Sequence, residues 1–145
     1  MTDLIAYMLN EHEFCNELFC DSENLATESK WVELRSAFER FVKESERHFA
    51  KEEQVLFPRA EETMGAHGGP TAVMRMEHEQ MRALIDRLNT MIGDENKTGF
   101  LGETETLLVL MQQHNMKEEQ ILYPMIGELV GDNAAAVIEQ MEKIQ

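Results

Sequence analysis

Apolar residues recur every three or four positions along most of this chain, which is the spacing of a helix with one buried face. No segment alternates between apolar and polar residues as a half-buried strand does. The glycines and prolines gather at Gly65–Pro70, Gly93–Gly102 and Gly131–Asn133, where we expect turns. The pattern predicts four long helices and a short closing one, at about Asp3–Cys20, Ser29–Met64, Thr71–Ile92, Gly102–Ile126 and Asn133–Lys143.

Long helices joined by short connections favour an all-α fold, an up-down-up-down four-helix bundle with a short C-terminal helix. The 145 residues suffice for one domain with its own core, so we expect a single domain over 1–145. Pro58 and Pro124 fall inside predicted helices, where proline is costly, so each should kink or break its helix.

The composition narrows the classes of partner. The formal net charge is −15, which argues against nucleic acid and anionic membranes. We find no run of 18 apolar residues, and no basic segment followed by an apolar run at the N-terminus. We therefore expect no membrane span and no signal peptide, and a cytoplasmic location.

Cys15 and Cys20 are five residues apart on one predicted helix, which disfavours a disulfide and suggests that Cys15 is a small buried side chain.

An internal repeat divides the chain into two halves. His48–Pro58 reads HFAKEEQVLFP and His114–Pro124 reads HNMKEEQILYP, with seven of the 11 positions identical at an offset of 66 residues. The tripeptide Glu-His-Glu around His12 returns around His78 at the same offset. Each half thus holds a lone histidine and, 36 residues later, a histidine followed by a glutamate four positions on. Residues four apart share one face of a helix.

Six histidines and glutamates lie within apolar stripes where a core side chain is expected. The stripe of the second helix ends in His48, Glu52 and Val55, and that of the fourth contains Met111, His114, Glu118, Ile121 and Met125. Burying a carboxylate is costly unless it is paired or binds a metal, and a single His-x-x-x-Glu pair would more often be a solvated ion pair. The repeat and the equal spacing favour a metal site formed by His12, His48, Glu52, His78, His114 and Glu118.

In this hypothesis His12 and His48 bind one ion, His78 and His114 bind another, and Glu52 and Glu118 bridge them. The ligand mix suits redox-active transition metals better than calcium or magnesium, although zinc also accepts it. Glu53 and Glu119 should point away, because one step along a helix rotates a side chain by about 100°. Two readings stay open for other acidic neighbours, which either orient an imidazole or are solvated charges: Glu11, Glu44 and Glu77. We expect His67, in the glycine-rich turn, to be no ligand.

These residues resemble the hemerythrin-like (HHE cation-binding) family over nearly the whole chain, on the motif H-x-x-x-E-E-Q-x-L-[FY]-P. The resemblance implies a four-helix bundle with a non-haem di-iron centre, two iron ions per chain, that reacts with small oxidants. Oxygen-carrying members use a fifth histidine one turn from the third, where this chain has Met74 and Arg82, and H-x-x-x-x-D in the last helix. The set of four histidines and two glutamates is more similar to iron-sulfur-cluster repair di-iron proteins. Those usually carry an N-terminal cysteine-bearing domain that this sequence lacks, so a shared site does not by itself imply the repair role.

The expected function is to bind or react with O2, peroxide or NO in oxidative or nitrosative stress, with electrons from an unidentified reductase. The alternative is a binding module, an iron or oxygen sensor or a metal store, without turnover. Whether the protein is an enzyme stays open. Reversible oxygen carriage is disfavoured by the missing fifth histidine.

Overall fold

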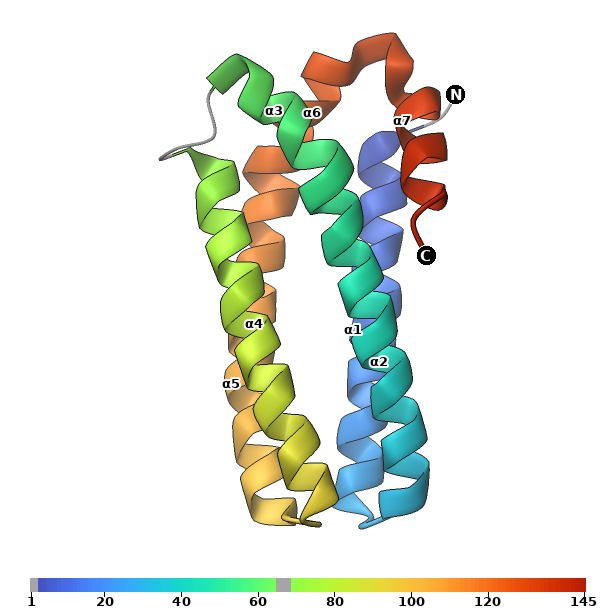
Figure 1. Cartoon of the computed structure of the whole chain (residues 1–145), viewed down its shortest axis with the longest axis vertical. Helices are drawn as coiled ribbons and strands as arrows, with labels where there is room; N and C mark the ends of the chain where they lie inside the picture. The colour runs from blue at the N-terminus through green and yellow to red at the C-terminus, as the bar shows by residue number, and fades with distance from the viewer. Residues whose placement is uncertain (1–2, 65–68) are drawn as a thin grey trace.

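The computed structural model describes residues 3–64 and 69–145, and every element in these two ranges is helical. Two antiparallel helical hairpins stand side by side, α1 with α2 and α4 with α5 (Figure 1). Their bounds are α1 Leu4–Thr27, α2 Trp31–Lys51, α4 Pro70–Gly93 and α5 Lys97–Lys117. The predicted four-helix bundle is therefore confirmed. His67 lies outside the described residues, as does most of the expected turn at Gly65–Pro70, and Pro70 already begins α4.

Both repeated motifs continue beyond the long helices through a π-helical turn. These turns are η1, Glu52–Leu56, and η2, Glu118–Leu122, and each leads into a short helix, α3 Phe57–Met64 or α6 Tyr123–Val130. Proline lacks an N–H and its ring clashes with the carbonyl four residues before it. A turn widened to five residues accommodates this, and the N–H of Phe57 donates to the carbonyl of Glu52, as that of Tyr123 does to Glu118. The predicted disturbance at Pro58 and Pro124 thus takes the form of π turns.

The extra residue in each π turn changes which side chains face the core. We expected Ile121 in the buried stripe, but its side chain is 60% exposed, and Leu122 and Tyr123 are buried instead. In the first half Val55 is only half-buried, while Leu56 and Phe57 are fully buried. A stripe extrapolated at the α-helical period is therefore wrong by one position beyond each glutamate.

Some predicted helix ends also differ from the structure. Helix α1 continues past Cys20 to Thr27 because Ser22 and Ala26 extend its buried face, and Ser22 donates to the Leu18 carbonyl within the helix. Helix α5 begins at Lys97, ahead of the predicted Gly102, because the Asn96 side chain accepts the Gly99 N–H at 2.9 Å and caps it. The last turn is a 3-10 turn, η3 Gly131–Asn133, followed by α7 Ala134–Glu142.

Two apolar clusters fill the bundle on either side of the polar layer. One lies towards the α1–α2 and α4–α5 connections and includes Phe19, Phe38, Phe41, Leu88 and Leu107. The other lies where α3, α6 and α7 cover the opposite end (Figure 1) and includes Met8, Leu56, Phe57, Tyr123 and Val137. The histidines and glutamates of the repeat are thus shielded from solvent at both ends of the bundle.

One helical stretch, Lys97–Glu142, contains a window that is long and apolar enough to cross a membrane by length and composition alone. This is weak evidence, because core helices of soluble proteins meet the same criterion. The stretch is also not one straight helix, since it includes η2 and η3 and α7 packs back beside α6 and α1.

Candidate metal centre

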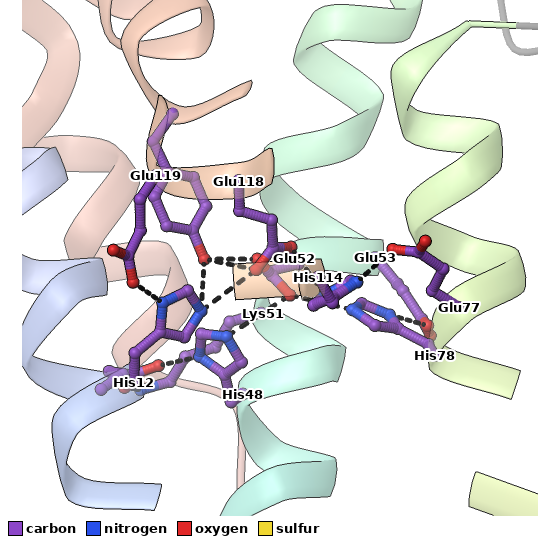
Figure 2. Close-up of polar contacts among 12 residues, drawn as sticks. His12, His48, Lys51, Glu52, Glu53, Glu77, His78, His114, Glu118 and Glu119 are labelled. Carbon is purple, nitrogen blue, oxygen red and sulfur yellow. Dashed lines mark hydrogen bonds and ion pairs between the residues drawn. The ribbon is translucent and has the colours of Figure 1, made fainter. Parts of the chain in front are cut away.

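The structure brings the six repeat residues together in the middle of the bundle. The two bridging candidates, Glu52 and Glu118, each open a π turn, and one histidine comes from each long helix. Two groups of four could each hold a metal ion, with donor atoms within 4.8 Å of one another: His12, His48, Glu52 and Glu118, and Glu52, His78, His114 and Glu118. We call His12 and His48 the first pair and His78 and His114 the second pair. Figure 2 shows the two pairs on either side of Glu52 and Glu118.

Every histidine of the two pairs has its Nδ1 atom bound to a second carboxylate. We call these glutamates the outer carboxylates; the bonds are His12–Glu119 at 2.7 Å, His48–Glu11 at 2.8 Å, His78–Glu53 at 2.7 Å and His114–Glu77 at 2.9 Å. A carboxylate accepts the Nδ1 proton, which leaves the Nε2 lone pair free to face the centre of the cluster. All four imidazoles are therefore oriented as metal ligands usually are.

Two of these contacts were not predicted from the sequence. Glu53 and Glu119 were expected to point away from the ions, and neither belongs to a candidate ligand group, yet each binds Nδ1 of a histidine of the other half (Figure 2). The physical reason is the π turn. It has more residues per turn than an α-helix, so the angle between successive side chains around the helix axis is smaller. Glu11 and Glu77 do orient imidazoles, so that reading is correct for both. Glu44 lies 4.0 Å from Arg47 and binds no imidazole in the described part of the chain.

Two lysines that the sequence analysis did not consider hold two of the outer carboxylates. Lys51, buried in the core, donates to Glu11 and to the Tyr7 hydroxyl, and Lys117 donates to Glu77 at 2.5 Å. Burial by itself raises the pKa of Glu11, but His48 and Lys51 lower it to about 2. The sequence could have indicated this role, because both repeated motifs have a lysine three residues after the histidine.

Arg82 stands at one of the two positions where a fifth histidine is missing. In the structure it contacts an outer carboxylate. Its guanidinium group binds both oxygens of Glu53 at 3.1 Å. Burial raises the pKa of Glu53, but bonding to His78 and Arg82 outweighs it and lowers the pKa to about 2. Glu53 is therefore ionised and held against the Nδ1 atom of His78.

The atoms that face the centre are buried and largely without hydrogen-bond partners. Glu118 places Oε1 3.0 Å from Nε2 of His12 and Oε2 3.2 Å from Nε2 of His114. Glu52 places Oε1 3.4 Å from His48 and 3.1 Å from His78. Within the described residues, buried atoms lacking a hydrogen bond include His48 Nε2, His78 Nε2, His114 Nε2, Glu52 Oε1 and Glu118 Oε2. Converging lone pairs of this kind are unfavourable unless a cation lies between them, so the residues fit a metal pair.

Tyr123 is a polar residue of this cluster that sequence reasoning missed. Its hydroxyl donates to Glu52 Oε2 at 2.6 Å and lies 3.0 Å from His12 Nε2 and 3.1 Å from Glu118 Oε1. Burial, with the negative charges of Glu118 and Glu52, raises the pKa of Tyr123 well above its usual value. It was missed because the α-helical register placed Ile121 and Met125 in the core, which left Tyr123 off the buried stripe.

The protonation of the cluster follows from its charge. Burial alone would lower the pKa of His12, but bonding to Glu118 and the charges of Glu118 and Glu52 raise it to about 9. Burial would likewise lower the pKa of His78, but bonding to Glu52 and Glu53 raises it to about 9. Burial and the neighbouring Glu118 raise the pKa of Glu52. In the absence of a cation, protons thus supply the positive charge that the buried carboxylates require.

A cavity of about 20 Å³ adjoins the first pair, lined by His12, His48, Cys15, Ser45, Met81 and Met111 among others. It has room for roughly one water-sized molecule. The thiol of Cys15 is buried, and burial raises its pKa to about 12, so it is neutral at ordinary pH. Cys15 and Cys20 are both free, as expected.

Comparison with known proteins agrees with this site. The family model for the hemerythrin HHE cation binding domain matches residues 3–126. Two iron-sulfur cluster repair proteins named YtfE, from Pectobacterium carotovorum and Pectobacterium atrosepticum, are each 62% identical to this chain over 32 residues. That segment covers 22% of this chain and only 14% of either relative. A search of solved structures gave no significant match. Because the family model spans most of the chain and the structure has the corresponding bundle, the chain belongs to the hemerythrin HHE cation-binding family.

Proposed function

We propose that this protein holds a pair of iron ions, one on the first pair and one on the second pair, bridged by Glu52 and Glu118. The observation that carries the proposal is the set of buried Nε2 and carboxylate atoms that converge without hydrogen-bond partners in the described chain. Imidazole and carboxylate together suit iron and also accept zinc. The four outer carboxylates would fix the imidazoles and raise their basicity as ligands.

We further propose that the metal pair binds or reacts with O2, peroxide or NO, as part of a response to oxidative or nitrosative stress in the cytoplasm. A bound iron pair supplies the electrons for such chemistry, and a separate reductase would restore them. The chain contributes a site closed at both ends by apolar clusters and a cavity of about 20 Å³ beside the first pair, which suits very small molecules. The printed role of the relatives, iron-sulfur cluster repair, supports a stress function, although they share only a short segment.

The test is metal analysis and an absorption spectrum of protein purified without oxygen, followed by exposure to O2, peroxide or NO. Two irons per chain and a spectrum that responds to one of these oxidants would support the proposal. Catalytic consumption of the oxidant in the presence of a reductant indicates an enzyme. Stoichiometric consumption favours the alternative, an iron or oxygen sensor or a metal store. A fully loaded protein that holds one ion, or that responds to none of the three, would contradict it.

The outer carboxylates give a prediction that differs from the one drawn from sequence. Glu119→Ala should weaken metal binding by about 10–100-fold, because His12 loses the partner that fixes its ring. Glu53→Ala should do the same through His78. The stoichiometry should remain two at saturating metal, since neither residue lies among the candidate ligand groups. A metal titration measures this, with Glu44→Ala as the matched control on α2. Affinity unchanged in both variants would contradict the role assigned here.

The metal-free protein should lose stability as pH rises. The pKa of His12 and of His78 is about 9 in the folded protein against an ordinary value of 6.5. Their contribution is therefore fully present below pH 6.5 and is lost as pH rises through 9, and the raised pKa of Glu52 acts in the same direction. Two such groups are worth a few kcal/mol, or on the order of 10 °C in Tm. Thermal unfolding with chelator at pH 6 and pH 9 measures it, and a higher Tm at pH 9 would contradict it.

A further inference from the structure

The hydroxyl of Tyr123 is a polar group of the cluster that the first half lacks at the equivalent position. The repeat places Phe57 at the equivalent position of the first half. The two rings sit alike: Tyr123 stacks on His12 with centroids 5.5 Å apart, and Phe57 stacks on His78 at 5.7 Å. Both side chains are at most 1% exposed. Packing therefore requires an aromatic ring at this position but not a hydroxyl, so the hydroxyl needs another explanation.

The hydroxyl lies among atoms of the proposed metal ligands. Its hydrogen-bonding neighbours are Glu52 Oε2, His12 Nε2 and Glu118 Oε1, at 2.6, 3.0 and 3.1 Å, and all three belong to proposed ligand residues. Donor atoms around one six-coordinate ion with bonds of about 2.1 Å lie about 3 Å apart. The Tyr123 oxygen has this spacing from two donors of the first candidate ligand group, His12 Nε2 and Glu118 Oε1. Phe57 offers no donor atom at the matching place beside the second pair.

We propose that Tyr123 is a further ligand, through its oxygen, of the ion held by His12 and His48, and that the two metal positions are therefore unequal. The proposal rests on the proposed function, since it assumes that both positions bind iron. Binding replaces the O–H bond with an oxygen–metal bond. The proton, which Glu52 Oε2 accepts at 2.6 Å in this structure, is released to solvent as the metal binds, so that Glu52 stays an anionic bridge. An anionic oxygen ligand favours ferric over ferrous iron, so the ion of the first pair should be the easier of the two to oxidise.

The experiment is an absorption and resonance Raman spectrum of the chain loaded with two ferric ions, because tyrosine oxygen bound to ferric iron absorbs visible light by charge transfer. The wild-type protein should show this band, and Tyr123→Phe should lose it completely while keeping two irons. The chain has only two tyrosines, so Tyr7→Phe is the matched control and should keep the band. Phe57→Tyr supplies a hydroxyl to the second pair and should roughly double the band at equal iron content.

The outcomes separate this inference from the proposed function. A wild-type protein with two irons and no tyrosine band would overturn the inference and leave the iron pair intact. A band that survives Tyr123→Phe, or that disappears in Tyr7→Phe, would also overturn it. A Phe57→Tyr spectrum identical with that of the wild type would show that the position in the repeat does not confer ligation, and would overturn it too. A chain that takes up fewer than two irons would overturn both proposals.

Discussion

Removing the metal at pH 8 should lower the Tm of the loaded protein by about 15 °C or more. A ligand that binds only the folded state stabilises it by about 4 kcal/mol when its free concentration is a thousand times Kd, so two ions contribute about 8 kcal/mol. For a chain of this size each kcal/mol corresponds to about 2–4 °C. The physical cause is the loss of counter-charge for Glu52 and Glu118, both 0% exposed. Thermal unfolding before and after chelation measures the difference.

The size of this effect should depend on pH. At pH 6 protons on His12 and His78 partly replace the cations, because both pKa values are raised to about 9. The drop in Tm on chelation should therefore be smaller at pH 6 than at pH 8. Adding the same chelator to protein that never received metal is the control. A Tm that chelation leaves unchanged at both pH values would contradict a metal site in the core.

Glu118→Ala should reduce the metal content from two ions per chain to one or none. Glu118 Oε1 lies beside Nε2 of His12, and Glu118 Oε2 lies beside Nε2 of His114. Loss of this side chain therefore removes a ligand from both metal positions. Glu52→Ala should also lose at least one ion, because Glu52 Oε1 faces a histidine of each pair. Either change should abolish magnetic coupling between the ions. Elemental analysis and magnetic spectroscopy of samples reconstituted with excess iron measure these effects.

The comparison with the outer carboxylates makes this prediction specific. Alanine at Glu53 or Glu119 should lower affinity but leave two ions at saturation, whereas alanine at Glu52 or Glu118 should change the number bound. Glu17→Ala, at an exposed position of α1, should change neither. If all four cluster variants gave the same stoichiometry and affinity, the division into bridging and outer carboxylates would be wrong.

The sequence was sufficient to predict the bundle and the six residues that meet in it, because both depend on spacing along α-helices. The pairing of each lone histidine with the one 36 residues later follows from folding each half into a hairpin. Several features that the sequence did not predict share one cause: the exposure of Ile121, the contacts of Glu53 and Glu119 with imidazoles, and the presence of Tyr123 all follow from the π turns. A proline signals that a helix is disturbed, but not that the disturbance adds one residue to a turn.

Other differences have local causes. The first helix was predicted to end at Cys20, yet burial of Ala26 continues α1 to Thr27. The glycines at 99 and 102 suggested a long turn, yet the Asn96 cap starts α5 before them. Tertiary packing outweighs weak local preferences in both places.

The contacts of Glu53 and Glu119 are reciprocal: the first hairpin gives a carboxylate to His78, and the second gives one to His12. Such an exchange is the defining property of an isologous interface, the kind found between the subunits of a two-fold symmetric dimer. The boundary between the hairpins thus has the form of a dimer interface enclosed in one chain. A half-chain paired with its own copy would provide every one of these crossed bonds. Joining the halves in one chain has a distinct consequence, since equivalent positions can then carry different residues, as Phe57 and Tyr123 do.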